Sequence, residues 1–466
     1  MRYVSDKIVN LYNLSPIWVR SLSSTIYGIL KNEKENNKLF FKSFNELKDS
    51  QWWSIEKLKE LQNRRLKYII SYSARHVPYY RRIFAEYGIE PSQIQTLGDL
   101  KKLPKLSKEI IRKEAHNLIS DEFDITRLRK ASTSGTTGTP LTIWLDDKTY
   151  LYSKAAQKLQ HIWANYNINY WIGILAGYKV VPIDRKRPPF WIKNYKGKQI
   201  HFSSYHLSIK NIYYYFKALK KNEIKFLMGY PSTIGLLAKF INSYIQKKVL
   251  LKGVFLSSEP IYEWQRSEIK KAFQCKIFDY FGQAESVANA MNCNQTDNLH
   301  IIMEKSVIEL DEVADNQFKI IGTSLINYAM PLIRYDLNDV TGGFVKGECA
   351  CGRKHYLIKP IETKMEDFVV TTEGYIISAS ILTFPFKTPK GIIESQIIQE
   401  ELDVLVIKLI TNNKFDERQE KELLNNISRC VGNNMKIFIE KVNKIPRTKN
   451  GKFRFVVSNI KEKIAL

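Results

Sequence analysis

ASTSGTTGTP, residues 131–140, joins a basic segment to an apolar run and combines two glycines with small hydroxylated residues. Gly135 and Gly138 allow a turn in which backbone N–H groups converge, and the neighbouring hydroxyls add donors, as the terminal phosphates of a nucleotide require. The glycines are three residues apart and no Lys-Ser or Lys-Thr pair follows, so the stretch is neither a Walker loop nor a GxGxxG turn. Taken alone, it is either a phosphate loop or a Ser/Thr/Gly surface linker.

A second informative stretch is KVNKIPRTKNGKFRFVVS, residues 441–458, in which Lys452 follows Gly451 and precedes a strand-like run. A lysine on a glycine-flanked loop can enter a site as a mobile cation, and an ammonium suits a reaction in which a carboxylate approaches a phosphate. A solvated Lys-rich turn explains the same residues if they stand alone. The presence of the 131–140 loop favours the catalytic interpretation.

The order of apolar runs predicts the fold class. Between residues 95 and 260, short β-rich runs alternate with helical stretches, which is typical of crossover units and a largely parallel sheet covered by helices. A helix is expected from Ser54 to near Pro78, and Asp416 opens another in a region of strands. We therefore predict an α/β chain with a helical N-terminal extension at 1–65, a large domain with mixed or parallel sheets and covering helices at 66–362, and a small α+β C-terminal domain at 363–466.

Composition limits the classes of protein that fit. The 466 residues are 44% hydrophobic and 12% aromatic, which is enough for a dry interior. The 72 Lys and Arg against 47 Asp and Glu give a net charge of +25, which attracts nucleotides, nucleic acids or anionic lipids. Lysines are spread along the chain without an Arg-rich tail or a CxxC finger pair, so we expect no nucleic-acid partner. With no run of roughly 18–20 apolar residues and no signal-like start, we expect a cytoplasmic protein.

Together, the TSGTTGTP loop (133–140) and the PRTxxGK loop (446–452) resemble the phosphate loop and the catalytic lysine loop of the adenylate-forming superfamily of acyl-CoA synthetases and related ligases. The resemblance extends to the branch with phenylacetate-CoA ligase and the CapK-type proteins of capsule biosynthesis loci. It lies in HVPYYRRIFAEYGIEPSQIQTLGDLKKLPKLSKEIIRK, LSIKNIYYYFKALKKNEIKFLMGYPSTIGLLAKFI and LSSEPIYEW, and covers about residues 65–460. It implies an adenylation domain followed by a small mobile C-terminal domain.

The resemblance also implies roles for individual residues. The run Tyr280-Phe281-Gly282-Gln283-Ala284-Glu285 is similar to the aromatic-Gly-x-Thr-Glu motif, which implies an aromatic ring near adenine and Mg²⁺ held by Glu285. Ala284 replaces the usual Thr, so a hydroxyl that would contact the α-phosphate is missing. The other residues expected at the nucleotide are Ser134, Gly135, Thr136, Thr137, Gly138 and Thr139 in the phosphate loop, Ser258, Glu259 and Pro260 beside adenine, Asp339 at the ribose, and Arg334 as a structural or substrate-side cation.

Two further positions depart from the family pattern. The hinge between body and lid reads Gly-Arg-x-Asp-Asp in the family, and here Thr363-Lys364-Met365-Glu366-Asp367 takes its place. The charges of Lys364, Glu366 and Asp367 match the pattern. A β-branched Thr does not take a positive φ as easily as Gly, so we expect a stiffer or differently placed hinge. Leu141 stands where a Lys usually follows the phosphate loop.

Five cysteines, an odd number in a long chain, do not indicate a disulfide framework. Cys293, His300, Cys349 and Cys351 form a set of three thiols and one imidazole, which suits a closed tetrahedral zinc site with a structural role. Their spacing is not a common finger pattern, and four unrelated residues are the alternative. The resemblance implies a Cys/His/Cys/Cys cluster at matching positions in the branch.

The resemblance implies that ATP and Mg²⁺ convert a carboxylic acid to an acyl-adenylate, with Lys452 between the carboxylate and the α-phosphate. Because two anions must meet, the transition state requires charge neutralisation. Phenylacetate-type ligases imply CoA as the acyl acceptor, whereas the capsule-associated relatives imply a sugar amine or hydroxyl and peripheral association with a membrane polysaccharide assembly. A non-catalytic basic scaffold is the competing hypothesis from another class.

Overall fold

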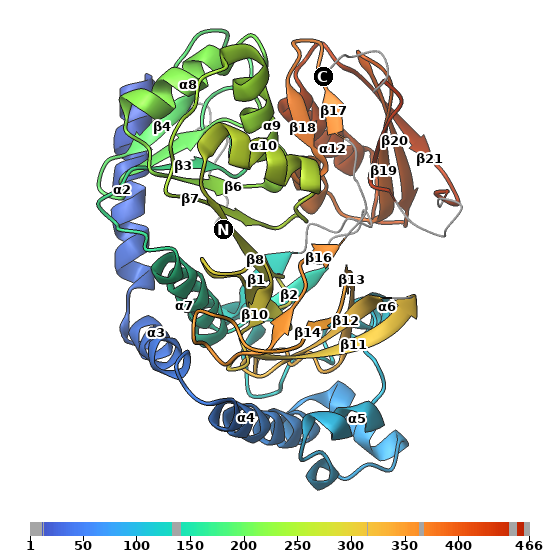
Figure 1. The fold of residues 1–466 in the computed structure, drawn as a ribbon. Helices are drawn as coiled ribbons and strands as arrows, with labels where there is room; N and C mark the ends of the chain where they lie inside the picture. Colours follow the sequence, from blue (N-terminus) through green and yellow to red (C-terminus); the bar gives the residue numbers. More distant parts are fainter. Residues whose placement is uncertain are drawn as a thin grey trace.

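The computed structural model describes residues 12, 14–132, 141–314, 316–362, 368–446 and 454–460. It has the predicted α/β architecture, with large sheets, covering helices and a small α+β unit at the C-terminal end of the chain (Figure 1).

A ten-stranded sheet forms the centre of the large domain (Figure 1). In sheet order its strands are β14 (Phe344–Val345), β15 (Leu357–Ile358), β10 (Leu299–Ile301), β9 (Asn289–Met291), β8 (Lys276–Gly282), β7 (Gly253–Ser257), β6 (Phe226–Gly229), β3 (Ile172–Leu175), β5 (Gln199–Phe202) and β4 (Trp191–Asn194). The five strands from β8 to β5 run parallel, and antiparallel strands extend the sheet on both sides. The carboxyl ends of β6, β7 and β8 therefore meet at one edge.

Helices cover this sheet because its parallel strands are apolar on both faces. Leu227 and Val254 of the sheet pack with Leu237 and Ile269 of two covering helices in one core. The helices of this part are α6 (Lys108–Lys113), α7 (Asp147–Trp163), α8 (Ile212–Lys221), α9 (Pro231–Phe240) and α10 (Glu263–Phe273). A π-helical turn at Ile241–Ile245 follows α9 directly, so the helical stretch continues to Ile245.

Two smaller antiparallel sheets accompany the central one. Strands β1 (Arg129–Ser132) and β2 (Thr142–Leu145) pair with each other, so the connection between them contains the predicted phosphate loop. The second sheet consists of β11 (Ser306–Ala314), β12 (Gln317–Ser324), β13 (Tyr335–Thr341) and β16 (Ile361–Glu362). Short 3₁₀ segments lie at Pro91–Gln93, Leu97–Lys102, Ile125–Arg127 and Phe384–Lys387.

The C-terminal part is a small α+β unit, as predicted. Its strands are the pair β17 (Phe368–Val370) and β18 (Ile376–Ser378), and the sheet β21 (Lys436–Lys441), β20 (Val404–Thr411), β19 (Ile392–Glu401) and β22 (Val456–Ser458). Its helices are α11 (Ala379–Leu382) and α12 (Glu417–Val431). The Asp416 carboxylate accepts the Gln419 N–H at 2.9 Å and caps α12, whose Leu423 and Ile427 pack on Leu405 and Ile407 of the sheet.

Four helices open the described chain: α2 (Ile17–Glu35), α3 (Lys38–Ser50), α4 (Ile55–His76) and α5 (Pro78–Glu86). The Ser54 hydroxyl accepts the Lys57 N–H at 3.4 Å and begins α4, and Val77 in extended conformation before Pro78 ends it, as the sequence predicted. The proposed boundary between 65 and 66 lies inside α4. α2 lies against β4 and α3 against α7, so these helices pack on the large domain.

Among the described residues, no helix combines the length and the apolar character needed to cross a bilayer.

Candidate active site and metal centre

The predicted nucleotide residues gather where two neighbouring parallel strands end. Ser258, Glu259 and Pro260 follow β7, and Tyr280, Phe281 and Gly282 close β8, which pairs with β7 through Ser257 and Tyr280. In open α/β sheets, ligands bind outside the carboxyl ends of the strands. The topology therefore brings these two motifs to the edge where a nucleotide is expected.

Close packing explains the Tyr-x-Gly order of the β8 motif. A Cβ on Gly282 would lie 2.5 Å from Asn289 Nδ2 and 2.8 Å from the Tyr280 ring. Asn289 also donates to the Tyr280 hydroxyl at 3.2 Å, which fixes this buried ring at the strand end.

In the next turn, Gln283 accepts the Ala288 N–H, while its buried Nε2 has no acceptor among the described residues. This amide is thus available to an acceptor on a ligand.

Glu285 and Asp339 lie in one electrostatic cluster. The Tyr335 hydroxyl donates to Glu285 Oε1 at 3.2 Å, and Tyr335 opens the strand that carries Asp339. Burial raises the pKa of Glu285, while hydrogen bonding and the positive charge of Lys108 oppose that shift. Burial, followed by the negative charges of Glu285 and Asp336, raises the pKa of Asp339 to about 7. Crowded carboxylates of this kind suit a bound cation.

Two cations on α6 were assigned no role from the sequence. Lys108 and Arg112 are four residues apart on α6, and this helix contacts β13. Burial and the positive charge of Arg112 lower the pKa of Lys108 to about 8, and Glu285 acts against this shift. Their four-residue spacing, which places both cations on one face of a helix, can be recognised in the sequence. The position of Lys108 beside Glu285, and of Arg112 near Tyr335, depends on tertiary packing, which a single sequence does not reveal.

The backbone around the site is unusual at three non-glycine residues. Ser258, Ser286 and Arg334 have φ angles of 72°, 59° and 55°, in the left-handed region. Such conformations cost about 1–3 kcal/mol each and are concentrated at functional sites. They flank the ends of β7 and β8 and the start of β13, and so mark the same region as the motifs.

Two predicted residues have contacts within the protein that define their place. The buried Arg334 guanidinium pairs with Glu309 at 3.0 Å and donates to the Leu103 carbonyl. These contacts are with protein groups and fit the structural one of its two expected roles. Glu259 Oε2 accepts the Ser232 N–H at 2.9 Å, in the first turn of α9. Their roles at the nucleotide stay predictions.

Several predicted site residues lie outside the described residues. They are Ser134, Gly135, Thr136, Thr137, Gly138 and Thr139 of the phosphate loop, Lys364, Glu366 and Asp367 of the hinge, and Lys452. The strands on both sides of the phosphate loop are described, and Ser132 pairs with Thr142 across it.

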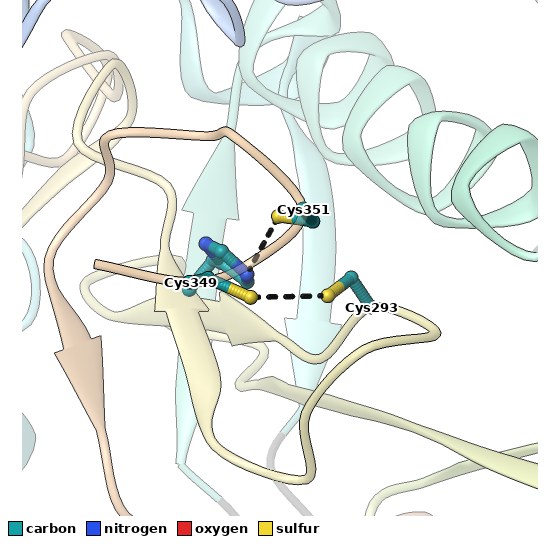
Figure 2. A group of neighbouring side chains, drawn as sticks. Cys293, Cys349 and Cys351 are labelled. Atoms are coloured by element: carbon teal, nitrogen blue, oxygen red, sulfur yellow. Dashed lines mark hydrogen bonds between the residues drawn. The ribbon is translucent and has the colours of Figure 1, made fainter.

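The four predicted zinc ligands converge. Figure 2 shows Cys293, Cys349 and Cys351 pointing toward one another, and the ligand atoms of these residues and His300 all lie within 4.8 Å of each other. The Sγ atoms of Cys293 and Cys349 are 3.7 Å apart, and Cys351 Sγ is 3.6 Å from His300 Nε2. A tetrahedral zinc ion has S···S edges of about 3.8 Å and S···N edges of about 3.6 Å. The residues present therefore fit zinc.

The surroundings connect this cluster to the N-terminal helices. The ring of His300 lies 5.3 Å from that of Trp163, whose Nε1 donates to Gln51 Oε1 at 2.8 Å. Arg353 also donates to Gln51 and lies 4.2 Å from the Trp163 ring. One expected feature of a zinc ligand is missing, because the buried His300 Nδ1 has no acceptor among the described residues. All four ligands would be protein atoms, so the site is closed and structural in type.

Comparison with known proteins supports the fold assignment. The solved structure of 2-hydroxyisobutyryl-CoA ligase in the postadenylation state superimposes with a TM-score of 0.53 and 18% identity, over 89% of this chain and 94% of that one. The fold is therefore that of the adenylate-forming ligases.

Sequence relatives define the branch. A family model described as the CapK C-terminal domain matches residues 369–459. The protein CapK of Staphylococcus aureus is 27% identical over 97% of this chain and 99% of its own length. A phenylacetate-coenzyme A ligase of Thermus thermophilus is 22% identical over 86% of this chain and 96% of its own length. The predicted resemblance to the adenylate-forming superfamily, in the branch of phenylacetate-CoA ligase and CapK, is confirmed, and with it the prediction of an adenylate-forming ligase.

Proposed function

We propose that this chain uses ATP and Mg²⁺ to convert a carboxylic acid to an acyl-adenylate and then transfers the acyl group to CoA. The observation that carries the proposal is the meeting of the β7 and β8 motifs with the Glu285–Asp339 cluster at one sheet edge. The similarity of nearly the whole chain to CapK and to phenylacetate-CoA ligases supports it.

Each residue has a part that its chemistry suits. Tyr280 supplies a fixed aromatic surface for adenine, and Asp339 accepts hydrogen bonds from the ribose hydroxyls. Glu285 would hold Mg²⁺, which supplies positive charge to the phosphate oxygens when it is bound. Lys452 supplies a second cation between the carboxylate and the α-phosphate, so that two anions can approach. The four-ligand cluster would hold zinc as a structural ion.

The domain organisation belongs to the same proposal. The parts are the N-terminal extension at 1–65, the adenylation domain at 66–362 and the C-terminal domain at 363–466. In the second step this C-terminal domain turns, so that Lys452 leaves and the acceptor enters. The residues Lys364, Glu366 and Asp367 would form the hinge.

A second acceptor is favoured by one observation. The C-terminal part matches the CapK C-terminal domain model, and this part faces the acceptor in the proposed second step. A sugar amine or hydroxyl is the alternative acceptor. Adding CoA or amino sugars separately to a preformed acyl-adenylate and identifying the acylated product by mass spectrometry distinguishes the two.

The decisive experiment measures carboxylate-dependent release of pyrophosphate across a panel of acids, with hydroxylamine to trap the adenylate. We expect Lys452→Ala to lower the rate about 10²–10³-fold, as the loss of a preorganised group at the transition state does. Lys444→Ala removes an exposed lysine of the same segment and is the matched control. Full adenylation by Lys452→Ala, or no release with any acid by the wild type, would contradict the proposal.

A further inference from the structure

Helix α2 presents an apolar face to the outside of the molecule. Along the helix and the turn before it, large apolar side chains recur about every four residues and are between 50% and 85% exposed. We call this set the α2 ridge: Leu14, Trp18, Leu22, Ile26, Tyr27 and Leu30. Figure 1 shows α2 at the outer edge of the molecule, beside β4. Contiguous exposed apolar surface of this kind marks an interaction site.

The opposite face of α2 explains why the apolar side chains point outward. β4 is the edge strand of the ten-stranded sheet, so its outer N–H groups need acceptors. The Ser21 hydroxyl accepts the Lys193 N–H and the Thr25 hydroxyl accepts the Tyr195 N–H, both at 3.1 Å. Gly28 lies so close to Asn194 that a side chain there would overlap it. The small polar face of α2 thus covers the sheet edge, and the ridge is left exposed, with Tyr27 within electrostatic reach of Tyr150 on α7.

Basic side chains surround the ridge. Ile17 of α2 packs with Val180, Val181 and Ile192, which places the N-terminal end of α2 near the loop that leads into β4. Exposed cations on this loop, on the β4–β5 turn, at the end of α2 and at the start of α3 are Lys186, Arg187, Lys196, Lys31, Lys34 and Lys38. The exposed acids of the same segments are Asp184 and Glu33. The surface is therefore apolar in the middle and positive at its borders.

We infer that the α2 ridge is a docking surface for an anionic lipid bilayer. Leu, Ile and Trp enter the boundary between headgroups and acyl chains, where aromatic rings are favoured, and the surrounding Lys and Arg contact anionic headgroups. Charge complementarity selects this occupant over a second copy of the chain, because two surfaces of a protein with a net charge of +25 repel each other. This inference does not depend on the proposed reaction.

The test is flotation of the full-length chain with vesicles of phosphatidylcholine and phosphatidylglycerol, compared with phosphatidylcholine alone, at low and high salt. The variant is Leu22→Gln/Ile26→Gln/Leu30→Gln, which keeps good helix formers on the ridge. The matched control is Leu250→Gln/Leu402→Gln/Phe438→Gln, three exposed apolar residues elsewhere on the surface. Thermal melting of each protein checks that it is folded, and light scattering after size exclusion gives its mass.

We expect the wild type and the control to float with phosphatidylglycerol vesicles at low salt, and the ridge variant to partition at least tenfold less. Equal flotation of the wild type and the folded ridge variant would overturn the inference, because the basic surface alone would then explain binding. Failure of the wild type to float would also overturn it. A dimeric mass for the wild type and the control, with a monomeric mass for the ridge variant, would overturn it as well.

Discussion

The pKa of Asp339 leads to a test of its role at the ribose. Burial and the negative charges of Glu285 and Asp336 raise this pKa to about 7, and only the ionised carboxylate accepts hydrogen bonds from both ribose hydroxyls. The ionised fraction is about 0.1 at pH 6 and about 0.9 at pH 8, so nucleoside affinity should rise about tenfold over this interval. The raised pKa of Glu285 acts in the same direction wherever Mg²⁺ takes part.

The assay should use adenosine, because it has no phosphate that titrates in this range. We expect calorimetric or fluorescence titration to give a dissociation constant that falls about tenfold from pH 6 to pH 8. Asp339→Asn should abolish this dependence and weaken binding at pH 8 by about 10- to 100-fold, because a hydrogen bond to a charged group is lost. Glu312→Gln, an exposed carboxylate on β11, is the control and should behave like the wild type.

A second variant tests the cause of the shift. Asp336→Asn removes one of the two negative charges that raise the pKa of Asp339, so the midpoint of the adenosine profile should move to lower pH. A flat profile in the wild type, or a tenfold rise that persists in Asp339→Asn, would refute the assignment of Asp339 to the ribose.

Two other predictions concern buried groups. The wild type should contain one zinc ion per chain by elemental analysis, and Cys349→Ser should lose the ion and melt at a lower temperature. Cys275→Ser, outside the cluster, should keep both the ion and the melting temperature. A wild type without metal, with the same melting temperature as Cys349→Ser, would argue against the site. Lys305 is fully buried with Ser153 Oγ 2.8 Å from its ammonium, and burial lowers its pKa to about 7. The folded state therefore binds fewer protons than the unfolded state between about pH 7 and pH 10, so the buried lysine destabilises the fold most at low pH. Lys305→Met removes this cost and loses the hydrogen bond to Ser153. The substitution should stabilise the protein by about 4 kcal/mol at pH 6 but only about 1 kcal/mol at pH 9. Urea unfolding at both pH values measures the gain, which should be absent in the exposed Lys248→Met; a gain independent of pH would show that titration of Lys305 is not its cause.

The sequence revealed most of the fold because its signals are local. Alternating β-rich and helical runs predicted the α/β body, and Ser54 and Asp416 cap the expected helices. The motifs at 258–260 and 280–285 could be placed together because the ends of parallel strands meet at one edge. The zinc cluster was predicted from the chemistry of three thiols and one imidazole together with the Cys/His/Cys/Cys cluster that the resemblance implies, and the four ligand atoms lie within 4.8 Å of each other.

What the sequence did not reveal depends on packing between distant segments. Lys108 acts on Glu285 although 177 positions separate them in the sequence. The outward apolar face of α2 is also hidden in the sequence, because a helix with an apolar face is normally expected to bury it. Only the pairing of Ser21 and Thr25 with the edge of β4 shows that the small polar face points inward.

The charges of the site explain why a basic chain would need a metal ion for the proposed reaction. Glu285, Asp336 and Asp339 place negative charge where the nucleotide is expected. Among the described cations, Lys108 acts on Glu285 and Lys319 pairs with Asp336 at 3.2 Å. A triphosphate and a carboxylate bring further negative charge to the same place, so repulsion would oppose their approach. Mg²⁺ at Glu285 and the Lys452 ammonium would reverse this balance locally, whereas the overall charge of +25 acts at longer range and raises the concentration of anions near the surface. Long-range attraction and local neutralisation are therefore separate requirements, and only the second depends on Lys452.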